Sequence, residues 1–544
     1  MSQTHEFDYV IVGSGTAGCV LANRLSADPS IKVVMLESGP PDDSWTMKVP
    51  AAVAAAIGDP RLGWGYFSVP QANLNGRKVA IPRGRVLGGC SSINGMAYFR
   101  GHPQDFDDWA AAGARGWSYR EVLPYFKLSE NNEAWPDSPL HGNGGPMNVI
   151  DIPKNNPLVD RFLQATDSLG YPRCRDFSSL KPEGFGPRQA TIRNGRRESG
   201  VTAYINPVRS RPNLSIVTGC HVERVLLEGK RAVGVRADQL GQTVEYKARR
   251  EVIMAAGAYG SPQLLMLSGI GPGEDLQALG IQVVHDMKGV GLGLHDHPAA
   301  AIGYVTKDPS SYGVSLKAFP RGAWNVLEYL LWRRGPLAGN VLEATGFIRS
   351  SEAETRPDLQ LVFMPVHRNP SGSPLPIGHG YGMISILARP QSRGTVRLAS
   401  DNSHDAPLID PNFLAVSQDL EKLLYGIKLT RSILNTPAFA PLASREVIPG
   451  DGTQSDDDWR EHIRRSLVTV HHPCSTCRMG EDDKAVVDSE LRVRGMEGLR
   501  VVDASVFPQV VAGNSNAGVV MVAEKASDLI LDKRPLPPLD LPPA

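Results

Sequence analysis

The sequence predicts a mixed α/β protein with two domains, and three features lead to this prediction. An apolar strand, a glycine-rich turn and a segment of helical spacing follow one another over residues 7–25. A second apolar strand at 32–36 completes a strand–turn–helix–strand unit. Apolar strand patterns then return at 251–255 and 499–502, so distant segments are expected to revisit the first domain while those between them form a second.

The glycine-rich turn reads GSGTAG and opens the predicted helix. Gly13 permits a tight turn, Gly15 lets backbone approach a pyrophosphate, and Gly18 lets helix and strand pack closely. The helix N-terminus offers unpaired N–H groups and partial positive charge to phosphates. Glu37 would accept hydrogen bonds from ribose hydroxyls and repel a 2′-phosphate, which favours FAD or NAD over NADP. The turn residues predicted to hold the dinucleotide are Gly13, Ser14, Gly15, Thr16, Ala17 and Gly18.

Shorter patterns predict the remaining elements. Apolar runs indicate strands at 214–218, 224–227, 251–255 and 499–502. The last two strands end at Ala256-Gly257 and at Asp503. A long helix with small residues at its start is expected over 517–531, and the Pro-rich tail at 534–544 shows no core-forming pattern.

Composition narrows the function classes. The chain has 544 residues, of which 41% are hydrophobic and 21% charged, and these values exclude disorder and collagen-like repeats. Lys+Arg and Asp+Glu both number 57, so no global field would attract nucleic acid or an anionic membrane, although local patches remain open. Six cysteines in a chain this long do not predict a disulfide framework.

Targeting signals are not evident. The N-terminus MSQTHEFDYV has neither a basic segment nor an apolar core of a signal peptide. No apolar run approaches the roughly 20 residues that span a bilayer. We therefore expect a cytoplasmic protein with reduced thiols.

Four separated parts of the chain together resemble the glucose–methanol–choline (GMC) oxidoreductases. They are the glycine turn with Glu37, RGRVLGGCSSINGMAYFR at 83–100, GAYGSPQLLMLSGIG at 257–271, and the pair HHPCSTCRMG (471–480) and VVDASVFPQVVAGNSNAG (501–518). The segment SINGMAYFRG is most similar to the branch of choline dehydrogenases and acceptor-dependent alcohol dehydrogenases.

The resemblance implies how the domains divide. It implies a Rossmann-like FAD-binding domain and a discontinuous substrate-binding domain built on an antiparallel sheet flanked by helices. The FAD-binding domain would comprise 1–155, 212–300 and 462–535. The substrate-binding domain would comprise 156–211 and 301–461, which leaves 536–544 as the Pro-rich tail.

The resemblance also implies which residues hold FAD. Beyond the glycine turn and Glu37, they are Arg85, Gly88, Gly89, Ser92, Asn94, Gly95, Met96, Ala97, Val222, Ala256, Gly257, Asp503, Ala504, Asn514 and Asn516. Some choline-oxidising relatives attach the flavin through a histidine, and Ile93 stands at that place here. We therefore expect non-covalent FAD.

Two residues are expected to carry the chemistry. Removal of hydride from an alcohol carbon needs a base for the hydroxyl proton, and an imidazole titrates near neutrality. His472 matches the family's catalytic histidine, and Asn514 matches the second position, where an amide can hydrogen-bond the substrate oxygen. The alternative for His472 is a buried structural histidine. His471 and Glu343 are further candidates for the substrate pocket, each with a purely structural alternative.

Three other features have competing interpretations. A metal or redox site is suggested by four neighbouring residues, His471, His472, Cys474 and Cys477. No second ligand pair or thioredoxin-like unit accompanies them, so no metal is expected. Asp296, in GLHDHP, lies either in a loop near the cofactor or in a structural turn. The apolar, aromatic segment 324–334 is a lid, a helix that touches a membrane, or ordinary core.

The sequence thus predicts an FAD-dependent enzyme that oxidises a primary alcohol to an aldehyde. Electrons would leave to O₂ or to a quinone-type acceptor, so both an oxidase and a dehydrogenase fit. Peripheral membrane contact is compatible with this prediction. The alternative is an FAD-containing lyase or photodecarboxylase of the same family.

Overall fold

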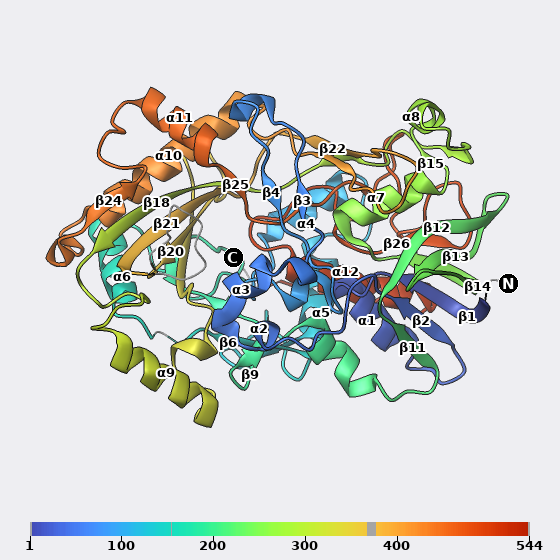
Figure 1. The fold of residues 1–544 in the computed structure, drawn as a ribbon, viewed down its shortest axis with the longest axis horizontal. Helices are drawn as coiled ribbons and strands as arrows, with labels where there is room; N and C mark the ends of the chain where they lie inside the picture. Colours follow the sequence, from blue (N-terminus) through green and yellow to red (C-terminus); the bar gives the residue numbers. More distant parts are fainter. Residues whose placement is uncertain (1–2, 154, 367–376, 542–544) are drawn as a thin grey trace.

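The computed structural model describes residues 3–153, 155–366 and 377–541 and contains two large sheets (Figure 1). The first sheet has seven strands and lies at the right of the figure. Its strands are β1 (Gln3–Val12), β2 (Val33–Leu36), β11 (Leu214–Val217), β12 (Cys220–Glu228), β13 (Arg231–Gln239), β14 (Gln242–Met254) and β26 (Leu499–Val501). The strands β11, β2, β1, β14 and β26 pair in parallel, whereas β12, β13 and β14 form an antiparallel meander.

Helices cover the parallel part of this sheet because its strands are apolar on both faces. Val10, Ile11 and Val33 are completely buried, as is usual for parallel strands. The helices α1 (Thr16–Leu25) and α12 (Asn516–Ile530) pack against each other, and α5 (Tyr119–Ser129) packs on α12. The helix α7 (Gly257–Leu267) follows directly after β14.

The second sheet also has seven strands, all antiparallel, and lies at the left of Figure 1. Its strands are β7 (Gly184–Pro187), β18 (Pro298–Thr306), β19 (Ala344–Ile348), β20 (Leu359–Met364), β21 (His379–Leu387), β24 (Arg445–Ile448) and β25 (Val468–Thr469). Helix α10 (Ser417–Leu434) packs on this sheet and contacts α6 (Leu158–Ser168) and α11 (Asp456–Ser466). The predicted fold class, a parallel nucleotide-binding sheet with a second antiparallel sheet flanked by helices, is confirmed.

Two segments pack with the other sheet than the expected division into domains gives them. Residues 201–205 form a π-helix whose apolar side chains belong to the core of the first sheet, not the second. Ile463 and Leu467 belong instead to the core of the second sheet. The Pro-rich tail is attached to the body, since Leu536 N–H donates to Tyr125 Oη at 3.0 Å and Leu539 packs against the first core.

The segment 324–334 lies mostly in α9 (Phe319–Trp332), a helix at the lower left edge of Figure 1. Tyr329 is buried, but Trp324, Leu330 and Trp332 are more than half exposed. Ordinary core packing is therefore the wrong interpretation of this segment. No helix in the described ranges is long and apolar enough to cross a membrane.

Candidate functional site

A long cavity lies where the N-terminal ends of three helices meet. The first residues of α1, α7 and α12 all line it. Among the described residues, no side chain bonds to the first N–H groups of α1 and α12, whereas at α7 Asp503 Oδ2 accepts a hydrogen bond from Gly257 N at 2.8 Å. An uncapped helix N-terminus leaves N–H groups without a partner and carries partial positive charge. Two such ends at one cavity favour an anionic ligand, and a pyrophosphate is of this kind.

The glycines of the first turn are required by close backbone contacts. Gly13 has φ +101°, and a Cβ there would lie 2.5 Å from Ala255 O. At Gly18 a Cβ would lie 2.0 Å from Gly13 O, so α1 can pack on β1 only with glycine at this position. At Gly15 the nearest atom would be 3.9 Å away, and the space left open there belongs to the cavity.

Glu37 lies at the end of β2 and lines the same cavity, although it is only 7% exposed. Its Oε2 accepts hydrogen bonds from Ser14 Oγ at 2.6 Å and Ser14 N at 3.2 Å, and its Oε1 accepts one from Gly39 N at 2.8 Å. Burial raises the pKa of Glu37, and these donors act in the opposite direction. The carboxyl is thus fixed in place at the cavity wall.

Most of the sequence-predicted residues line this cavity. They are Gly13, Gly15, Thr16, Ala17, Glu37, Gly89, Asn94, Gly95, Met96, Ala97, Val222, Ala256, Gly257, His471, His472, Asp503, Ala504, Asn514 and Asn516. Because they come from segments as distant as 13 and 516, the fold brings them together across nearly the whole chain.

Five predicted cofactor residues lie behind or beside the wall instead. Ser14 Oγ accepts a hydrogen bond from Gly88 N at 3.2 Å, so both residues support the wall. Ser92 Oγ donates to Leu87 O at 2.7 Å and fixes the turn of its own loop. Gly18 is at the contact of α1 with β1, and exposed Arg85 stacks over Trp64 at 5.2 Å.

Glu343, predicted for the substrate pocket, is not among the residues that line the cavity. It is 3% exposed and accepts hydrogen bonds from Asn155 N at 3.1 Å and Asn156 N at 3.2 Å, and another from Tyr312 Oη. These contacts give Glu343 a structural role at the start of α6.

The pairing of β18 with β25 places two histidines side by side. Pro298 is opposite Thr469, and Val470 N donates to His297 O at 3.1 Å. The residues that precede β18 therefore run beside those that follow β25. As a result His297 Nδ1 lies 3.0 Å from His472 Nδ1, and Asn514 Nδ2 lies 2.9 Å from His472 Nε2.

The hydrogen bonds of this chain determine which ring nitrogens carry protons. His297 Nε2 lies 3.1 Å from Ala388 O, and a carbonyl can only accept, so this nitrogen carries the proton. Neutral His297 then accepts at Nδ1, which requires His472 to donate from its own Nδ1. His472 Nε2 is therefore unprotonated and accepts a hydrogen bond from Asn514 Nδ2 at 2.9 Å, at the cavity wall.

Burial keeps both rings neutral. The pKa of His472 is held well below its ordinary value, first by burial and then by the neighbouring His297 and His471. Burial lowers the pKa of His297 to about 4. An unprotonated imidazole nitrogen can accept a proton, which an imidazolium cannot do.

The backbone at the histidine pair is held by Asp296 and Arg83. Asp296 Oδ1 accepts from His472 N at 2.8 Å, and its Oδ2 accepts from Thr469 Oγ1 at 2.5 Å. His471 has φ +70°, a conformation that costs an ordinary residue roughly 1–2 kcal/mol. Arg83 Nη1 donates to His471 O at 2.9 Å and helps to hold this strained residue.

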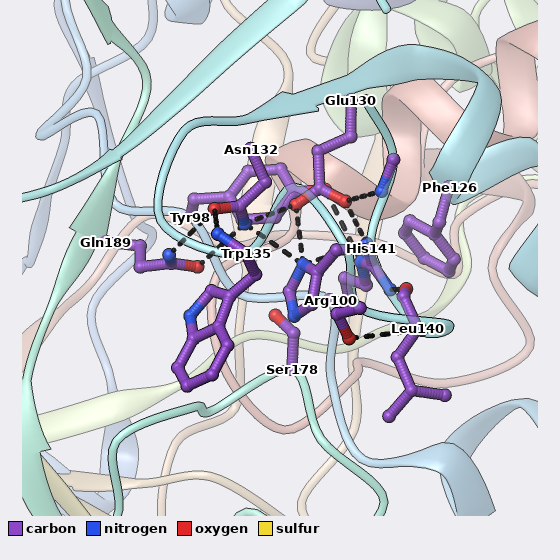
Figure 2. A network of polar contacts seen from close by, with 12 residues as sticks. Tyr98, Arg100, Phe126, Glu130, Asn132, Trp135, Leu140, His141, Ser178 and Gln189 are labelled. Carbon is purple, nitrogen blue, oxygen red and sulfur yellow. Dashed lines mark hydrogen bonds and ion pairs between the residues drawn. The ribbon is translucent and has the colours of Figure 1, made fainter. Parts of the chain in front are cut away.

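A buried polar network anchors the chain beyond the 88–97 loop (Figure 2). Arg100 and Glu130 form an ion pair with fully buried side chains, and His141 Nδ1 lies 3.1 Å from Glu130 Oε1. Burial alone would raise the pKa of Glu130, but Arg100 and His141 outweigh it and lower this pKa to about 2. The Gln189 side chain joins the network through Asn132. The backbone carbonyl of Gln189 accepts a hydrogen bond from the backbone N–H of Tyr98 at 3.0 Å.

The metal and redox interpretations of the segment 471–477 depend on its two cysteines. Cys474 and Cys477 are both buried free thiols, and burial raises the pKa of Cys474 to about 12. No group of three or more His, Cys, Asp or Glu side chains within the described ranges could hold a metal ion.

Sequence reasoning missed several residues of the site. His297 stands two positions after His295 in GLHDHP, and a second histidine in this loop was the available signal. Arg83, Tyr259 and His221 also line the cavity. Three buried polar atoms have no hydrogen-bond partner among the described residues: Tyr259 Oη, His471 Nδ1 and Asn514 Oδ1. Polar groups of a bound molecule fit beside them, because buried polar atoms are normally hydrogen-bonded.

A glycine-rich turn, an uncapped helix N-terminus and a buried carboxylate line the same cavity as an unprotonated imidazole, and this combination suits a nucleotide cofactor with an acid–base group beside it. Family models described as GMC oxidoreductase match residues 7–299 and 390–523. The chain therefore belongs to the GMC oxidoreductase family, which confirms the resemblance seen in the sequence.

Two curated relatives match almost the whole chain. An alcohol dehydrogenase [acceptor] from Pseudomonas putida is 41% identical over 98% of this chain and 97% of its own length. An oxygen-dependent choline dehydrogenase from Chromohalobacter salexigens is 42% identical over 99% and 97%.

Solved structures show the same fold. Pyridoxine 4-oxidase from Mesorbium loti has a TM-score of 0.87 and 33% identity, with 97% of this chain and 100% of that chain covered. An FAD-dependent oxidoreductase from Chaetomium thermophilum has a TM-score of 0.88 and 28% identity, with 97% and 99% covered.

Proposed function

We propose that this protein oxidises a primary alcohol to an aldehyde with bound FAD. The single observation that carries the proposal is the series of hydrogen bonds that joins His297, His472 and Asn514. It leaves His472 Nε2 unprotonated at the cavity. The named activities of the two curated relatives, alcohol and choline dehydrogenation, support the same reaction class.

The cavity residues fit FAD. The uncapped start of α1 would hold the pyrophosphate, and buried Glu37 would accept hydrogen bonds from the adenosine ribose. When bound, the flavin would supply the hydride acceptor, while the protein supplies position and electrostatics.

The residues of this chain would handle the proton. His472 Nε2 would accept the hydroxyl proton of the alcohol, and the Asn514 amide would donate a hydrogen bond to the substrate oxygen. His297 acts through His472, since its acceptor nitrogen keeps the His472 proton on Nδ1. We therefore assign His297 as a positioning residue.

The alcohol-oxidation proposal is tested by anaerobic addition of a panel of primary alcohols to the purified yellow protein. Bleaching of the oxidised flavin spectrum is expected with at least one alcohol. A lyase or photodecarboxylase of the same family would leave the spectrum unchanged. Reoxidation by O₂, read as peroxide, against reoxidation by a quinone then separates an oxidase from a dehydrogenase.

FAD is expected to leave the protein on acid precipitation. Ile93 lies in the cavity wall where a linking histidine would be needed, and its side chain packs with Met47 and Val86. A hydrocarbon side chain provides no nucleophile for a covalent bond to the flavin. A colourless pellet and a yellow supernatant are the predicted result, and a pellet that stays yellow would show that a covalent link exists.

Replacing Glu37 by Gln should weaken FAD retention and leave the fold intact. The carboxylate accepts three hydrogen bonds from Ser14 and Gly39, and Gln offers one acceptor oxygen where Glu offers two. Loss of about one charge-assisted hydrogen bond corresponds to roughly tenfold or more in affinity. Equilibrium titration of the apoprotein with FAD measures this, and unchanged affinity would contradict the ribose assignment.

A further inference from the structure

Helix α9 presents an apolar face to solvent. Seven large apolar side chains of this helix are between 45% and 72% exposed: Phe319, Trp324, Val326, Leu327, Leu330, Leu331 and Trp332. Leu316, just before the helix, is 95% exposed. A continuous apolar surface of this kind is unusual on a monomer and marks a contact site for a partner or a membrane.

The attachment of α9 explains why this face stays outside. Tyr329 is buried, and its hydroxyl donates to Gly195 O at 3.1 Å. The helix thus rests on the hairpin of β9 (Ile192–Arg193) and β10 (Arg196–Arg197) by one edge. With 14 residues it is shorter than the roughly 20 needed to span a bilayer, but long enough to lie in the plane of one.

A cationic cleft adjoins the end of α9. Arg333, which follows the helix directly, lines this cleft together with Lys48 and the β9–β10 hairpin. Its cationic side chains are Lys48, Arg193, Arg196, Arg197, Arg209 and Arg333, and its acidic ones are Asp42, Asp43 and Glu198. The cleft therefore has a surplus of positive charge, even though the whole chain is neutral.

One arginine of the cleft has unused hydrogen-bonding capacity. Arg197 is 3% exposed, and its Nη1 donates to Asn94 O at 2.6 Å, but its buried Nη2 has no partner among the described residues. A guanidinium with a free donor suits a phosphate oxygen. Trp45, 66% exposed, stands on α2 (Trp45–Lys48), the short helix that also contributes Lys48 to the cleft (Figure 1).

We propose that α9 and this cleft together form a docking surface for an anionic phospholipid membrane. The helix would lie in the interface with its aromatic and aliphatic side chains among the upper acyl chains, and the cleft would take lipid phosphates. Apolar area with tryptophan beside a cationic surplus matches the chemistry of such a surface. The proposal is independent of alcohol oxidation, and docking can be measured without substrate or turnover.

The test is flotation of the FAD-loaded protein with vesicles of phosphatidylcholine alone or with about one third phosphatidylglycerol. We expect binding to the anionic vesicles and at least about tenfold weaker binding to the neutral ones. Trp324→Ser combined with Leu331→Ser should weaken binding about tenfold or more, and so should Arg196→Glu. The matched controls are Leu240→Ser and Arg224→Glu, exposed residues of the first sheet region, and both should bind as the wild type does.

Three results would overturn the proposal. They are equal binding to both vesicle types, no binding to either, and equal weakening by the control substitutions. Sedimentation velocity of the same proteins decides whether α9 instead joins two copies of the chain. A wild-type dimer that the Trp324→Ser/Leu331→Ser variant converts to a monomer, without vesicle binding, would assign the face to a protein contact.

Discussion

Replacing His472 by Ala should slow reduction of the bound flavin by about 10²–10⁴-fold while FAD remains bound, the usual contribution of a general base. The alcohol oxygen must lose its proton as hydride leaves the carbon, and the variant has no acceptor beside the Asn514 amide. Anaerobic stopped-flow absorbance measures the rate directly. Asn514→Ala should cost less, since it removes one hydrogen bond and leaves the base in place.

The pH profile provides a sharper test of this assignment. The pKa of His472 is depressed by burial, so the ring is unprotonated at neutral pH. Wild-type flavin reduction should therefore be flat near neutrality and fall only as the pH drops through a pKa below the ordinary histidine range. His472→Ala should lose this acidic limb. His404→Ala, a half-exposed histidine outside the pair, is the control and should behave as wild type. A rate in His472→Ala within about twofold of wild type would refute the assignment.

Replacing His297 by Leu should slow flavin reduction by about 10–10²-fold. Leucine cannot accept a hydrogen bond from His472 Nδ1, so the His472 ring loses the contact that keeps its Nε2 unprotonated at the cavity. Substitutions that disturb the tautomer or orientation of a catalytic imidazole act in this way. The same stopped-flow experiment measures the effect.

Asparagine at position 297 separates positioning from packing. Its side-chain carbonyl can accept the His472 proton, so His297→Asn should recover most of the rate that His297→Leu loses. Both variants alter the volume of a fully buried site, so a purely structural role would make them similar. Equal losses in the two variants, with an unchanged acidic limb, would show that His297 does not set the tautomer.

The local elements of the nucleotide-binding part follow from sequence because short-range rules determine them. The GSGTAG sequence predicts the conformation of its turn. Gly13 adopts a positive φ, and Gly18 packs so closely against Gly13 O that a Cβ would not fit. Glu37 follows a strand whose four residues are all buried, so its place at the strand end was predictable. The long motifs, in their order along the chain, resemble those of the family and indicate it without any geometry.

What the sequence determined by itself was the fold class, the nucleotide turn and the identity of His472 and Asn514 as candidates. Only the tertiary structure decided that His297 accepts from His472, that Ser92 and Glu343 do not line the cavity, and that α9 lies outside the core. The physical reason is that these outcomes depend on pairing between segments far apart in the chain. The register of β18 against β25 sets the distance between two rings 175 positions apart, and no local pattern encodes it.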